Sequence, residues 1–79
     1  MARKIFVEVV AKFSPSGKLT PLWMVWEDGI RYDIDRVLDV RRAASLKAGG
    51  IGIRYTVVIS GRERFLYFDD SQWFVEGKE

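Results

Sequence analysis

The stretch LWMVWEDGIRYDIDRVL, residues Leu22 to Leu38, decides the fold, because apolar and aromatic residues alternate on both sides of an Asp-Gly pair. An Asp-Gly pair between two alternating runs is the strongest short-range signal for a β-hairpin. The sequence therefore predicts two antiparallel strands that are joined at or around Asp28-Gly29.

The register of this hairpin depends on the length of its loop. A two-residue loop, Asp28-Gly29, places Trp23 and Val25 on the face of Ile30, Tyr32 and Ile34. A three-residue loop from Glu27 to Gly29, with a G1 bulge at the glycine, reverses this. The shared face then holds Leu22, Met24, Trp26, Ile30, Tyr32 and Ile34. We favour the three-residue loop, because it separates apolar from polar residues better in the second strand, and we expect Trp23 to be exposed.

Alternating patterns predict further strands on both sides of this hairpin. Lys4 to Phe13 forms a first strand, with Ile5, Val7, Val9, Ala11 and Phe13 on one face. The clearest alternation of the chain is that of Ile53, Tyr55, Val57 and Ile59, whose face continues through Leu66 and Phe68. Turn-forming residues separate these strands at Ser14–Gly17, Ser60–Glu63 and Asp69–Gln72.

Residues 35–48 allow two interpretations. Asp35 is a suitable helix cap, the run contains good helix formers, and Gly49-Gly50 would end a helix. However, Arg41 and Arg42 interrupt the apolar stripe that such a helix needs. We favour a long, bent strand that runs through Val37 to about Ala44, and a short helix remains the alternative.

The last strands carry aromatic residues on both faces. Pairing Phe68 with Trp73, and Leu66 with Val75, places these four side chains inside. The opposite face then holds Val58, Phe65, Tyr67 and Phe74. Either these residues form a second, minor core, or they meet a partner.

Length and composition indicate one small folded domain, residues 1–79, in which 48% of residues are hydrophobic and none is cysteine. A core this small makes a dimer plausible. No apolar run is long enough to span a membrane, and charges interrupt the first ten residues, unlike in a signal peptide. We therefore expect a cytoplasmic protein.

The residue types present argue against most enzymatic chemistry. Without histidine or cysteine, the chain lacks the commonest general base, the thiolate nucleophile and the usual zinc ligands. Asp33 and Asp35 alternate on one strand face, which a solvated surface explains better than catalysis or cation binding. Gly49-Gly50-Ile51-Gly52 precedes a strand, whereas phosphate loops precede helices. We expect no enzyme, no metal and no cofactor.

Basic residues are concentrated in the middle of the chain, where residues 36–64 carry a formal charge of +5. Small β-barrels bind nucleic acid through cations that contact phosphates and aromatic rings that stack on bases. The candidate cations are Arg41, Arg42, Lys47, Arg54, Arg62 and Arg64. The rival hypothesis is a protein-interaction or self-assembly module, in which Trp23, Phe65, Tyr67 and Phe74 contact a protein partner or a second copy.

Several stretches of the chain resemble a family of uncharacterised small proteins from Gram-positive, Clostridia-like bacteria. These stretches are WEDG at Trp26–Gly29, IDRVLDVRRAASLKAGG at Ile34–Gly50, GIRYT at Gly52–Thr56 and WFVE at Trp73–Glu76. The resemblance implies no assigned activity and transfers no functional residues.

Together, these patterns predict a mainly β fold. We expect an antiparallel meander of about five or six strands that curls into a small, partly open SH3-like barrel. The alternative is an α+β fold with a short helix within residues 35–48.

Overall fold

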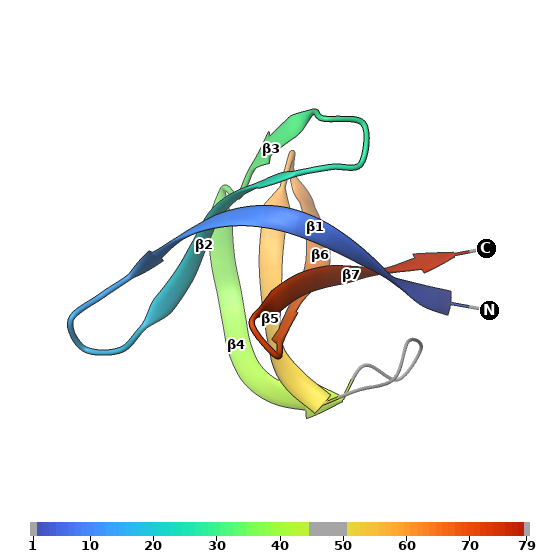
Figure 1. Ribbon diagram of the computed structural model, residues 1–79. Coiled ribbons are helices and arrows are strands. Elements are labelled where there is room, and N and C mark those ends of the chain that lie inside the picture. Colours follow the sequence, from blue (N-terminus) through green and yellow to red (C-terminus); the bar gives the residue numbers. More distant parts are fainter. Residues whose placement is uncertain (1, 45–50, 79) are drawn as a thin grey trace.

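The computed structural model describes residues 2–44 and 51–78, and in this part of the chain it contains strands and no helix (Figure 1). All strands belong to one antiparallel sheet, which confirms the mainly β prediction. The seven strands are β1 (Ala2–Phe13), β2 (Leu19–Val25), β3 (Arg31–Asp33), β4 (Arg36–Ala44), β5 (Ile51–Ile59), β6 (Arg62–Asp69) and β7 (Gln72–Lys78). The expected number of strands was too low.

The sheet curls strongly into an open half-barrel, in the order β3-β2-β1-β7-β6-β5-β4 (Figure 1). Each strand from β4 to β7 is paired with the next, and β7 returns to pair with β1. The chain crosses between the two ends of the sheet at Ile34-Asp35. The Ile34 amide donates to the Leu22 carbonyl of β2, whereas the Asp35 amide donates to the Val58 carbonyl of β5.

The β2–β3 hairpin has the predicted three-residue loop. The Gly29 amide donates to the Trp26 carbonyl and the Trp26 amide to the Ile30 carbonyl, and Gly29 has a φ of 84°. This is a type I turn followed by a G1 bulge, and the required left-handed conformation suits glycine. Met24 lies opposite Tyr32 on the inner face, as the favoured register requires.

Two residues that were expected on this inner face are exposed instead, namely Leu22 and Ile30. Val10 lies opposite Trp23 but Ala11 lies opposite Pro21, so Leu22 has no partner on β1. Such a bulge inserts one residue and turns its side chain away from the regular alternation. Ile30 is exposed because it lies in the loop connection, outside β3.

The favoured strand through Val37 to about Ala44 is confirmed, because β4 spans Arg36–Ala44 and the described residues of this segment contain no helix. Val37 pairs with Val57, but Asp39 pairs with Thr56, so Leu38 is a second bulge residue. Residues 45–48 of the alternative helix lie outside the described part of the chain. Packing of a paired strand outweighs the helix propensity of this run.

The expected tight turns of the C-terminal half are present. Ser60 and Gly61 have φ values of 52° and 76°, and Asp70 and Ser71 have φ values of 51° and 61°. Two successive left-handed residues define a type I′ turn, whose twist matches that of the flanking strands. The β6–β7 turn therefore uses two non-glycine residues in a conformation that favours glycine.

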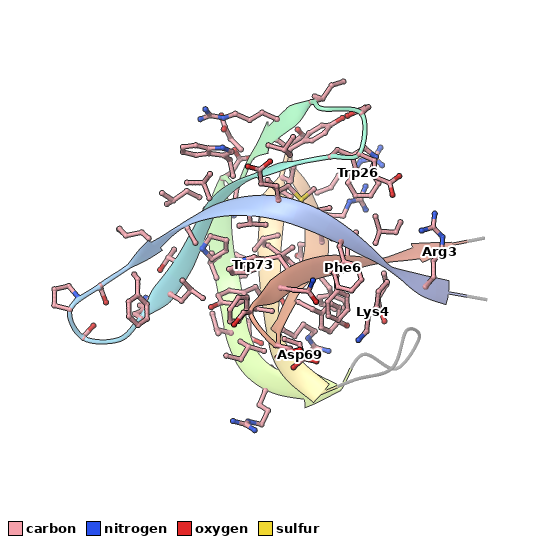
Figure 2. The ribbon with its side chains drawn as sticks, viewed as in Figure 1. Arg3, Lys4, Phe6, Trp26, Asp69 and Trp73 are labelled. Carbon is pink, nitrogen blue, oxygen red and sulfur yellow. The ribbon has the colours of Figure 1, made fainter. Side chains whose placement is uncertain are left out.

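The main core lies on the inner, concave face of the sheet. Tyr55, Val57, Ile59 and Leu66 are buried there together with Met24 from the hairpin. These positions follow the predicted alternation of β5 and β6, and burial of such side chains contributes about 1.5–3 kcal/mol each. Trp73 packs against this core, with its ring centroid 5.3 Å from that of Tyr55 (Figure 2).

Candidate binding site at the β6–β7 opening

Strands β6 and β7 pair for only a short distance. Phe68 lies opposite Trp73, as predicted, and the ladder includes Tyr67 with Phe74 but does not reach the expected pair of Leu66 and Val75. Beyond this point β7 stays paired with β1, whereas β6 stays paired with β5. The two strands therefore separate, which leaves an opening in the curled sheet.

A hollow of about 660 Å³ lies at this opening. Its apolar surface comes from Met24, Val57, Leu66 and Val75, with Trp26 and Tyr32 contributed by the hairpin. In Figure 2, Trp26 lies beside the loop that joins β2 and β3. Pockets for small ligands have volumes of roughly 300–1,000 Å³ and combine an apolar lining with a few polar groups. The hollow fits this description.

Two arginines from the predicted basic set line the hollow. Arg64 lies opposite Val57 and Arg62 lies opposite Ile59, and both of these β5 residues are buried on the inner face. Cross-strand partners share a face of the sheet, so both arginines belong to the concave side. Both are exposed, and neither forms an ion pair within residues 2–44 and 51–78. They give the mouth of an apolar hollow two positive charges.

Carboxylates accompany these cations, since Glu63 and Glu76 also line the hollow. Glu76 interacts with Tyr67. The charge of the mouth is therefore mixed, with the arginines on β6 and one of the carboxylates on β7. An anionic ligand group would be directed toward Arg62 and Arg64.

The other predicted cations lie elsewhere, so the basic set does not form one patch. Arg41 lies opposite Arg54 on the outer face, and the Arg41 Nε donates to Asp39 Oδ2 at 2.6 Å. Arg42 follows Arg41 on β4 and is exposed. Lys47 lies outside the described residues. Of the described members of the set, Arg62 and Arg64 line the hollow together with aromatic side chains.

The outer aromatic residues form a minor core and not a continuous contact surface. The rings of Tyr67 and Phe74 stack with their centroids 5.1 Å apart, and Phe6 meets Phe74 edge-on at a centroid distance of 6.0 Å. Tyr67 and Phe74 are 3% and 2% exposed, which corrects their expected place on an interaction surface. Phe65 remains 47% exposed, with the Arg54 guanidinium carbon 4.5 Å from its ring centroid.

Burial also changes the ionisation of Tyr67. Removal from solvent raises the pKa of its hydroxyl, the neighbouring charge of Glu76 raises it further, and Arg54 partly offsets the effect. The neutral phenol is therefore part of a polar cluster at the edge of the minor core.

Trp23 is half-buried and carries a cation above its ring, so it is less accessible than expected. The Arg31 guanidinium carbon lies 3.8 Å from the ring centroid, and Arg31 Nε donates to Asp33 Oδ1 at 2.8 Å. This three-residue contact covers part of the indole and engages Asp33, one of the two aspartates considered for catalysis. Neither Asp33 nor Asp35 lines the hollow.

Among the described residues, no group of three or more potential metal-binding carboxylates is present. The same part of the chain has no helix of sufficient length and apolarity to cross a membrane.

Sequence reasoning missed Trp26 and Tyr32 as site residues, because it assigned them to the core. The alternation along β6 could have identified the site, since Arg62 and Arg64 lie on the same face of the strand as the buried Leu66. Two arginines on an inner face indicate that this end of the sheet is open to solvent. The alternation pattern does not indicate that β6 and β7 separate after Tyr67 and Phe74.

Comparisons of the chain with protein-family models, with curated proteins and with solved structures find no match. The site is therefore interpreted from its own geometry and chemistry.

Proposed function

We propose that the protein is a non-enzymatic module that binds single-stranded nucleic acid at the β6–β7 opening. One base enters the hollow between Trp26 and Tyr32, and the adjoining phosphate contacts Arg62 and Arg64. The observation that carries this proposal is the presence of both arginines and both aromatic residues around one apolar hollow. The finer architecture that we propose is a partly open SH3-like barrel, supported by the return of β7 to pair with β1.

Elementary energetics favour a single strand over a duplex. Base-aromatic stacking contributes about 1–3 kcal/mol per base, and it requires a base that is already unpaired. Arginine–phosphate contacts release counterions and make the affinity dependent on salt. Glu63 and Glu76 repel phosphate from the rest of the mouth, so the backbone is expected to follow β6.

The experiment is a fluorescence-anisotropy titration with labelled DNA and RNA of about twelve nucleotides, single-stranded and duplex, at several salt concentrations. The test variant is Arg62→Gln/Arg64→Gln, and the matched control is Arg41→Gln/Arg42→Gln on β4. We expect the test variant to bind at least tenfold more weakly. The slope of log affinity against log salt concentration should become shallower by about 1–2. The control variant keeps the affinity of the wild type.

Two results would refute the proposal. One is the absence of binding to any oligonucleotide at low salt. The other is an equal loss of affinity in the test and control variants, because the β6–β7 opening would then have no special role.

A protein partner is the second candidate, and exposed aromatic residues on the outer face favour it. Phe6 and Phe65 are 53% and 47% exposed. Apolar association of this kind depends little on salt. Salt-insensitive self-association that is lost in Phe6→Ser/Phe65→Ser would support this alternative.

A further inference from the structure

We propose that the wedge between strands β2 and β4 binds an extended, acidic segment of a partner protein, which adds to β4 as a further strand. This inference is independent of the nucleic-acid site. It rests on the crossing at Ile34-Asp35, where the chain leaves β2 and joins β5. Before this crossing β3 pairs with β2, and after it β4 pairs with β5.

The wedge is a second hollow, of about 310 Å³, between β4 and the beginning of β2. It is lined by Lys18, Leu19 and Thr20 from one side and by Val37–Val40 from the other, with Tyr55 between them. In Figure 1 the β1–β2 hairpin projects past β4. Because β4 ends the order of the sheet, no strand of the described residues pairs with its outer backbone groups. An exposed strand edge is a template for an added strand.

Apolar side chains are exposed along the wedge. Leu38 and Val40 are each 46% exposed, and Leu22, near the crossing, is 38% exposed. Charges, bulges or proline commonly protect an edge strand from aggregation, and β4 carries the exposed arginines Arg36, Arg41 and Arg42. β4 has a bulge at Leu38, but it still presents two aliphatic side chains beside its free edge. Alternate residues of an added strand would cover them.

Charge indicates the composition of the partner segment. Lys18, Arg36 and Arg42 are exposed on the elements that border the wedge, and they form no ion pair within the described ranges. Asp39 pairs with Arg41. An extended segment that alternates aliphatic and acidic residues would match both the apolar and the basic groups. A nucleic acid would satisfy the cations but not the strand edge.

The test uses a synthetic seven-residue peptide of alternating Val and Glu as the probe. Amide shifts and hydrogen exchange of the 15N-labelled full chain are followed by NMR. We expect shifts and slower exchange at Asp39–Arg42. Two control peptides are the Val-Lys analogue, which reverses the charge, and the Val-Glu peptide with alternate N-methylated amides, which lacks strand-pairing donors. Both should bind at least tenfold more weakly.

The variant Arg42→Glu should bind the Val-Glu peptide at least fivefold more weakly than the wild type and the Val-Lys peptide more tightly. Arg3→Glu, an equal change of charge on β1, should leave both affinities unchanged.

The proposal is overturned if the β4 amides do not respond, or if the N-methylated peptide binds equally well. Equal losses of affinity for the Val-Glu peptide in Arg42→Glu and Arg3→Glu would show that only the net charge of the protein matters. Shifts at Asp39–Arg42 that depend on protein concentration without peptide would assign the wedge to a second copy of this chain.

Discussion

The Tyr55 hydroxyl donates a hydrogen bond of 2.7 Å to the carbonyl oxygen of Leu19. This bond joins the centre of β5 to the beginning of β2, two strands that do not pair with each other in the described part of the chain. The Tyr55 side chain therefore spans the floor of the wedge. It holds the open half-barrel at a fixed curvature.

Removal of this hydroxyl tests the bridge. We expect Tyr55→Phe to lower the free energy of unfolding by about 1–2 kcal/mol, because the partly buried hydrogen bond to the Leu19 carbonyl is lost. Urea denaturation followed by tryptophan fluorescence measures the change. Tyr32→Phe is the control, since the described residues give the Tyr32 hydroxyl no hydrogen bond. Equal losses in the two variants would show that the bond contributes nothing particular.

Alkaline pH tests the polar cluster around Tyr67. Burial and the charge of Glu76 raise the pKa of Tyr67 above its ordinary value of 10.0. The folded state then holds the phenolic proton more tightly than the unfolded chain, so this contribution is complete below about pH 10 and is lost above it. Burial raises the pKa of Tyr55 in the same direction. Denaturation at pH 8 to 11 should show stability falling above about pH 10, with a shallower fall in Tyr67→Phe. An unchanged slope in that variant would contradict the prediction.

The β6–β7 turn offers a stabilising substitution. Ser71 has a φ of 61°, which costs a residue with a Cβ about 1 kcal/mol more than glycine. We expect Ser71→Gly to raise the free energy of unfolding by about 0.5–1 kcal/mol in thermal or urea denaturation. Ser16→Gly, in the exposed β1–β2 turn and at an ordinary φ, should give no gain. A gain at both positions would point to an effect unrelated to the left-handed conformation.

Gly52 tests the close approach of β5 to the end of β6. A Cβ at this position would lie 2.6 Å from the Phe68 carbonyl oxygen and 2.8 Å from the Asp69 Cβ. We expect Gly52→Ala to destabilise the fold by about 1–3 kcal/mol, because backbone must move. In Gly77→Ala, by contrast, the new Cβ meets the end of the Ile5 side chain.

Shortening this side chain by Ile5→Val should therefore recover part of the loss in Gly77→Ala, as a double-mutant cycle would show. The same second change should not help Gly52→Ala. Recovery in both backgrounds would indicate general relaxation of the core and not relief of one contact.

Local chemistry made much of the fold predictable from the sequence. Gly29 after Asp28 determined the loop of the central hairpin, and the alternation of Tyr55 and Val57 determined the inner face of β5. Strand β4 was predicted because Arg41 and Arg42 break the apolar stripe of a helix. In each case the deciding interactions lie within a few residues of one another.

The missed features depend on contacts between distant parts of the chain. The bulge at Leu22 is visible only once β1 is paired with β2, because a bulge shifts one strand relative to the other. The burial of Tyr67 and Phe74 depends in part on Phe6 in the first strand. The prediction also failed to group Arg62 and Arg64 with Trp26 and Tyr32. Alternation places each residue on a strand face, but it does not reveal the opening between β6 and β7 that these residues share.

The pairing of residues 2–7 with residues 73–78 has a consequence for folding kinetics. The hairpins between consecutive strands close short loops, whereas the β1–β7 ladder closes almost the whole chain and bears a larger entropic cost. Topologies with many distant contacts fold slowly, so this ladder is expected to form late in the transition. In pulse-labelling hydrogen exchange during refolding, the amides of Val7 and Val75 would then become protected after those of Val57 and Leu66.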